Sequence, residues 1–166
     1  LNIDAKTLRY KTFGELNSDK YFYVIQGHSF AGFFSILQFA LCQLKVADEL
    51  GMIPVVDYKN FPNTYGKDGL GGNVWEYYFS PVSSYSLEEV YKSKHVFFSP
   101  SNFDWSMGRY LRKEDELYKY FKKYIRITEE VKKEIEDFYE SNFKGHKVLG
   151  VHWRGYEQNI TAGHPY

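Results

Sequence analysis

Hydrophobic and polar positions form two kinds of pattern along the first hundred residues of this 166-residue chain. Short runs that are dense in aromatic and β-branched residues predict buried strands at 21–26, 53–57 and 95–99. Between the first two runs, apolar residues at three- and four-residue steps predict a helix over 30–50, which Gly51 ends. A strand, a helix and a second strand within about forty residues predict a parallel β-α-β unit.

The second half of the chain is more polar and predicts more helix. A short helix is expected over 87–92, and longer ones over 114–124 and 128–143, the last of them capped by Thr128. A final apolar run over 147–155 predicts another strand. The predicted fold class is therefore α/β, with an open, mostly parallel sheet and flanking helices.

Composition excludes some classes of protein and leaves the fold class unchanged. Apolar residues make up 43% of the chain, which is enough for a packed core, and 21 basic residues balance 21 acidic ones. This neutral balance argues against a nucleic-acid-binding protein. No run approaches the roughly 18 apolar residues of a membrane span. Cys42 is the only cysteine, and the five histidines lack ligand spacing, so no metal site is predicted.

The most specific candidate site lies at the end of the last predicted strand. Arg154 follows His152 at the carboxyl end of that strand, where open α/β sheets bind their ligands. A guanidinium group matches phosphate with paired, planar hydrogen bonds, which makes a phosphate-bearing ligand the natural candidate. The alternative interpretation is that Arg154 is an arginine in a surface turn.

Two earlier strand ends offer weaker candidates. The turn from Gly27 to Gly32 loosely resembles a phosphate-cradling loop, and its Ser29 could cap the following helix. Asp57 ends the second strand, where it could bind a hydroxyl of a sugar or ribose, or could cap the turn that follows.

A family resemblance rests on one motif near the end of the chain, Gly150-Val-His-Trp-Arg-Gly155 followed by His164-Pro165. This arrangement resembles the first signature motif of the superfamily of α-1,6-fucosyltransferases, nodulation fucosyltransferases and protein O-fucosyltransferases. Earlier parts of the chain are compatible with the same family, namely Ile53-Pro-Val-Val-Asp57 as its second strand and the aromatic segment Asn73-Val-Trp-Glu-Tyr-Tyr-Phe79.

The resemblance implies a two-lobed glycosyltransferase of the GT-B type. Residues 1–146 would form its N-terminal, acceptor-side lobe, and residues 147–166 would begin a Rossmann-like donor lobe that continues beyond Tyr166. The implied reaction is the metal-independent transfer of fucose from GDP-fucose to a hydroxyl of a glycan or glycoconjugate. A sugar nucleotide and a glycan are then the expected partners, without a cofactor, in the cytoplasm or, in a eukaryotic cell, in the Golgi lumen.

By the same resemblance, four residues carry the implied chemistry. Arg154 contacts the donor diphosphate and stabilises the leaving nucleotide, with His152 and Gly155 beside it in the donor pocket. Glu157 keeps an acid, with a longer reach, at the place where the family commonly has an aspartate, and it is the second candidate catalytic residue, either as a base or as a group that orients the loop.

Two alternatives remain at the sequence level. Tyr156-Glu157 departs from the Thr-Asp that the family commonly has, which favours a non-catalytic carbohydrate-binding or scaffold domain on the same fold. A phosphatase that uses Arg154 and His152 fits less well, because Trp153 separates the two side chains.

Overall fold

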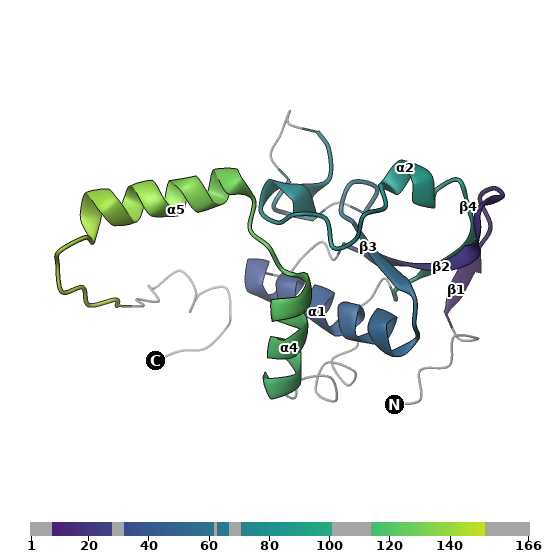
Figure 1. Cartoon of the computed structure of the whole chain (residues 1–166), viewed down its shortest axis with the longest axis horizontal. Coiled ribbons are helices and arrows are strands. Elements are labelled where there is room, and N and C mark those ends of the chain that lie inside the picture. The colour runs from purple at the N-terminus through teal and green to yellow at the C-terminus, as the bar shows by residue number, and fades with distance from the viewer. Residues whose placement is uncertain (1–7, 28–31, 62, 67–70, 101–113, 152–166) are drawn as a thin grey trace, which may run out of the picture. The chain divides into compact units, whose positions relative to one another are not determined.

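The structure is a computed structural model that describes residues 8–27, 32–61, 63–66, 71–100 and 114–151. Strands and helices are named as in Figure 1.

A four-stranded open sheet forms the centre of the fold, in the order β1-β4-β2-β3. Strand β2 (Leu16–Gln26) runs parallel to both of its neighbours, β3 (Ile53–Asp57) and β4 (Ser93–Phe98). Strand β1 (Arg9–Lys11) is the antiparallel edge strand on β4. The predicted α/β class with an open, mostly parallel sheet is therefore confirmed, and the strand expected at 53–57 has exactly those bounds.

Helix α1 (Phe33–Glu49) connects β2 to β3 and completes the predicted parallel β-α-β unit. Its N-cap is Gly32, which gives no side-chain cap. The described helix begins at Phe33, later than the predicted residue 30, and Ser29, the candidate cap, lies outside the described residues. At the other end Gly51 has φ +64°, a left-handed conformation that glycine adopts without strain, so the predicted helix stop is confirmed.

The two faces of the sheet bury different partners. Alternation along β2 turns Tyr23 and Ile25 toward the core that includes α1, and turns Phe22 and Val24 toward the opposite side. Helix α4 (Glu114–Tyr124) packs on α1 and has the bounds predicted from the sequence.

The opposite side is covered by shorter pieces of chain. They include the loop residues Phe13 and Tyr85 and the residues around helix α2 (Leu87–Val90), a helix shorter than the predicted 87–92. Between β3 and α2, the 3-10 helix η2 (Val74–Tyr77) is tied to β3 by Asn73, whose side chain donates to the Val56 carbonyl at 2.8 Å.

Contacts divide the chain after Glu129, and helix α5 (Glu129–Asn142) belongs mainly to the second unit. Its extent agrees with the helix predicted over 128–143, but none of its described side chains is buried. Residues 147–151, the described part of the last predicted strand, form no strand, and Leu149 is 86% exposed. That prediction is wrong for these residues. An apolar run becomes a strand only where a neighbouring strand pairs with its backbone, and no described residue pairs with this one.

Candidate functional site

The residues to which the sequence assigned donor chemistry are His152, Arg154, Gly155 and Glu157, and all four lie outside the described residues. The same holds for most of the turn between Gly27 and Gly32. The predicted phosphate site therefore stays a prediction. The described residues instead form a groove near the carboxyl ends of the parallel strands.

Asp57 fixes the turn at the carboxyl end of β3. Its side chain is fully buried, and one carboxylate oxygen accepts hydrogen bonds from the backbone amides of Lys59 at 3.1 Å and Asn60 at 2.9 Å. The other oxygen accepts from the Asn60 side-chain amide at 2.9 Å and from the Tyr91 hydroxyl at 2.5 Å. These four hydrogen bonds all come from the chain itself. Of the two sequence interpretations of Asp57, the structure supports the turn cap.

A groove of about 730 Å³ lies beside this turn. The side chains that matter for binding come from four separate segments of the chain, and they are of two kinds: polar groups on Arg9, Lys11 and Asn60, and rings on Phe13, Phe61, Tyr91 and Phe98. Small-molecule sites typically have volumes of roughly 300–1,000 Å³ and combine an apolar lining with a few polar groups. This groove therefore has the size and the composition of a ligand site.

The two cations of the groove rest on aromatic rings. The Arg9 guanidinium carbon lies 4.3 Å from the centre of the Phe98 ring, and the Lys11 Nζ lies 4.7 Å from the centre of the Phe13 ring. Attraction between a cation and a ring face holds each charge at the groove wall. In the amide orientation that satisfies both of its ends, Gln26 also accepts a hydrogen bond from Arg9 at 2.8 Å.

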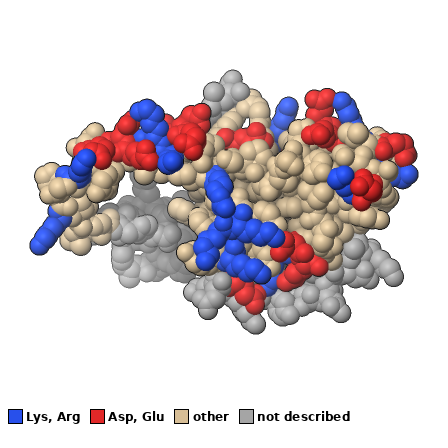
Figure 2. Space-filling view, viewed as in Figure 1, with Lys and Arg blue, Asp and Glu red and all other residues tan. Residues whose placement is uncertain are grey.

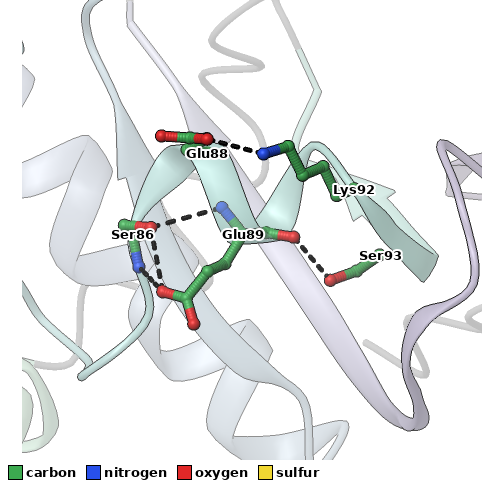
Figure 3. A network of polar contacts seen from close by, with 5 residues as sticks. All are labelled: Ser86, Glu88, Glu89, Lys92 and Ser93. Atoms are coloured by element: carbon green, nitrogen blue, oxygen red, sulfur yellow. Dashed lines mark hydrogen bonds and ion pairs between the residues drawn. The ribbon is translucent and has the colours of Figure 1, made fainter.

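Tyr91 is positioned by the short helix that precedes it. In a capping box, the Ser86 hydroxyl accepts from the Glu89 amide at 3.2 Å, while the Glu89 carboxylate accepts from the Ser86 amide at 2.9 Å (Figure 3). The Ser93 hydroxyl donates to the Glu89 carbonyl at 2.7 Å and closes the other end. Burial, and then the hydrogen bond to Asp57, raise the pKa of Tyr91, so its hydroxyl stays protonated and donates.

Close packing at this edge of the sheet requires a glycine at position 27. A Cβ at this position would lie 2.0 Å from the Phe61 carbonyl oxygen, so only glycine lets the loop that carries Phe61 approach the end of β2 this closely. In the sequence, Gly27 belongs to a turn that loosely resembles a phosphate-cradling loop. The structure gives it another role, which is to seat one wall of the groove.

The described residues that line the groove include cations, an amide and rings, but no carboxylate and no histidine. No carboxylate lines it there, and the nearby Asp57 carboxylate is occupied by its four hydrogen bonds. The described residues also hold no group of three or more His, Cys, Asp or Glu side chains that could bind a metal ion. In the same part of the chain, no helix is both long enough and apolar enough to cross a membrane.

The fold and the groove define a class: an open α/β domain with a cationic and aromatic groove near the carboxyl ends of its parallel strands. Comparisons with models of protein families, with curated proteins and with solved structures gave no match.

Proposed function

We propose that this chain supplies the acceptor-side lobe of a GT-B glycosyltransferase, which transfers fucose from GDP-fucose to a hydroxyl of a glycan or glycoconjugate without a metal ion. The motif at 150–155 supports the donor and the reaction type. Among the described residues, the groove is the observation that carries the proposal. Its partly exposed rings, Phe61 and Tyr91, can pack against the C–H faces of sugars, while Asn60 and Arg9 can bond to sugar hydroxyls.

The proposed donor chemistry belongs to Arg154. Negative charge grows on the diphosphate as the glycosidic bond breaks, and a cation already in place stabilises that charge without reorganisation. His152 and Gly155 would lie beside the diphosphate in the donor pocket. Glu157 is the candidate base that accepts the proton of the acceptor hydroxyl.

The test is transfer from GDP-fucose by the full-length protein and its Arg154→Ala variant. Loss of one preorganised contact to the developing charge is expected to lower kcat by about 10²–10³-fold, with the fold retained by circular dichroism. Arg126→Ala is the matched control, because among the described residues the Arg126 guanidinium donates to nearby backbone carbonyls, at 2.8 Å to Lys122 and 2.7 Å to Ile125. Near-normal transfer by Arg154→Ala would overturn the proposal.

A non-catalytic carbohydrate-binding domain is the second candidate. The observation that favours it is the lack of a carboxylate among the described residues that line the groove. Calorimetric titration with GDP-fucose separates the two functions. The enzyme binds the nucleotide through Arg154, whereas a binding domain takes a glycan and gives no heat with the nucleotide.

A further inference from the structure

The groove beside the Asp57 turn combines two cations with aromatic rings. We infer that it binds carbohydrates that carry a negative charge, with Arg9 and Lys11 holding a carboxylate or sulfate and the rings holding the sugar units. The inference rests on the proposed function, because it names the class of acceptor that the lobe would take.

Both cations of the groove lack an acidic partner among the described residues. Arg9 and Lys11 occupy alternate positions of β1, so both side chains leave the same face of the strand. Many other lysines around the sheet and α1 pair with carboxylates, namely Lys20, Lys45, Lys92, Lys94 and Lys123. In the described part of the chain, Arg9 and Lys11 contact rings and form no ion pair with an acidic side chain.

A charged ligand group completes this arrangement. A ligand that fills the groove removes water from the two cations, and desolvating a charge is costly unless a partner of opposite charge replaces the water. A neutral sugar would leave that cost unmet. A carboxylate or sulfate compensates it, because guanidinium forms paired, charge-assisted hydrogen bonds with planar and tetrahedral oxyanions.

The shape of the groove and its edge strand favour a saccharide over an acidic peptide. An acidic peptide would use such an edge by adding a strand to β1, but β1 has only three residues and offers few backbone groups for pairing. The groove instead presents the partly exposed rings of Phe13, Phe61 and Tyr91 together with the amide of Asn60. Ring faces and planar polar groups suit pyranose rings, whose faces are apolar and whose edges carry hydroxyls.

The test is calorimetric binding of two matched pairs of saccharides to the 166-residue chain. Trigalacturonic acid is compared with its methyl ester, and sulfated maltotriose with maltotriose, so that the members of each pair differ in charge while their rings are the same. The charged member of at least one pair is expected to bind about tenfold more tightly, which corresponds to one charge-assisted contact. The pair that shows the preference identifies the acidic group.

Variants assign this preference to the groove. Arg9→Gln is expected to weaken binding of the charged saccharide about tenfold and Lys11→Gln about threefold, with little effect on the neutral one. Lys11 is exposed, so its variant keeps the test valid if Arg9→Gln fails to fold. The control is Lys133→Gln, which removes an exposed lysine of α5 that pairs with Asp137.

Three results would overturn the inference: equal affinity for charged and neutral members of both pairs, affinities that neither variant changes, or tighter binding of hexaglutamate than of either acidic saccharide. The assay needs no GDP-fucose and measures no transfer. Charge-dependent binding without any transfer would therefore refute the enzyme and keep this inference. Transfer to neutral glycans with no preference for charge would do the reverse.

Discussion

Helices α1 and α5 have similar apolar spacing but opposite environments. In α1, Leu44 is fully buried against the sheet, whereas in α5 the residues of the apolar stripe stay accessible, with Ile135 56% and Phe138 55% exposed. Helix α1 connects two strands that pair in parallel, and this connection brings its apolar face onto the sheet. The comparison shows that apolar periodicity predicts a helix and its apolar face, while burial depends on what the rest of the fold places against that face.

The ion pairs of the two helices also differ, although each helix has a pair between positions i and i+4, which in α1 is Lys45–Glu49. Acidic and basic side chains are mixed along α5 in Figure 2, and its pairs join positions i and i+4 of one helix, as in Lys133–Asp137 at 2.5 Å. In α1, Asp48 pairs with Lys123 of α4 and so joins two elements. An ion pair within one helix stabilises that helix alone, whereas an ion pair between two elements also stabilises the contact between them.

The largest expected effect compares Leu44→Ala in α1 with Ile135→Ala in α5. Truncation of the fully buried Leu44 should lower the free energy of unfolding by about 2–5 kcal/mol, because it removes apolar contacts and leaves a cavity. Truncation of the half-exposed Ile135 should change it by about 0.5 kcal/mol or less. Urea denaturation, followed by circular dichroism, measures both. A loss above about 2 kcal/mol for Ile135→Ala would show that the face of α5 is covered.

The next effect concerns two glycines, one from each region. Gly27→Ala should destabilise the sheet unit by about 1–3 kcal/mol, because the new methyl group meets the Phe61 carbonyl and the loop must move. Gly150→Ala is the matched control, since a Cβ at Gly150 meets no atom within 4 Å. Thermal unfolding of both variants gives the comparison, and equal melting temperatures would contradict the close approach at Gly27. A displaced loop should also weaken ligand binding in the groove.

The sequence predicted elements whose pattern is local and missed those that depend on a distant partner. The run 53–57 is apolar up to Asp57, and its predicted bounds are those of β3, just as the predicted helix 114–124 has the bounds of α4. Strand β1 was missed because it has only three residues, all exposed, and exists through its pairing with β4. The run 147–151 shows the reverse error, since its apolar pattern has no partner strand among the described residues.

The groove was beyond sequence reasoning for the same reason. Its residues come from β1 and the loop after it, the turn after β3, the end of α2 and the end of β4, and no local pattern joins these segments. Two of its supports did have a local signal. Asp57 ends a strand and precedes a turn, and Ser86-Leu-Glu-Glu89 is a capping-box pattern. The donor residues around Arg154 rest on a motif, and the described residues leave them as predictions.

A smaller effect is expected from the capping box that positions Tyr91. Ser86→Ala removes the hydroxyl that accepts from the Glu89 amide and should cost about 1 kcal/mol of stability. It should also weaken saccharide binding, because Tyr91 follows directly after α2 and lines the groove. Ser84→Ala, at a neighbouring exposed serine, is the control. Unchanged stability and unchanged binding in Ser86→Ala would show that the capping box does not position Tyr91.

The smallest effect is the pH dependence of the pair between α1 and α4. The hydrogen bond from Lys123 holds the pKa of Asp48 below its ordinary value of 3.8. A carboxyl group with a lowered pKa in the folded state contributes stability above its unfolded value, and the contribution disappears as the pH falls through the folded value. Asp48→Asn should therefore cost about 0.5 kcal/mol near neutral pH, since the pair is partly exposed, and progressively less as the pH falls below 3.8 and through the lowered pKa of the folded state. Urea denaturation of wild type and variant at pH 7 and pH 2.5 tests this.

Asp137→Asn in α5, which removes a pair within one helix, should have a smaller effect at neutral pH. A difference for Asp48→Asn that stays constant between the two pH values would show that the carboxylate charge does not stabilise the α1–α4 contact.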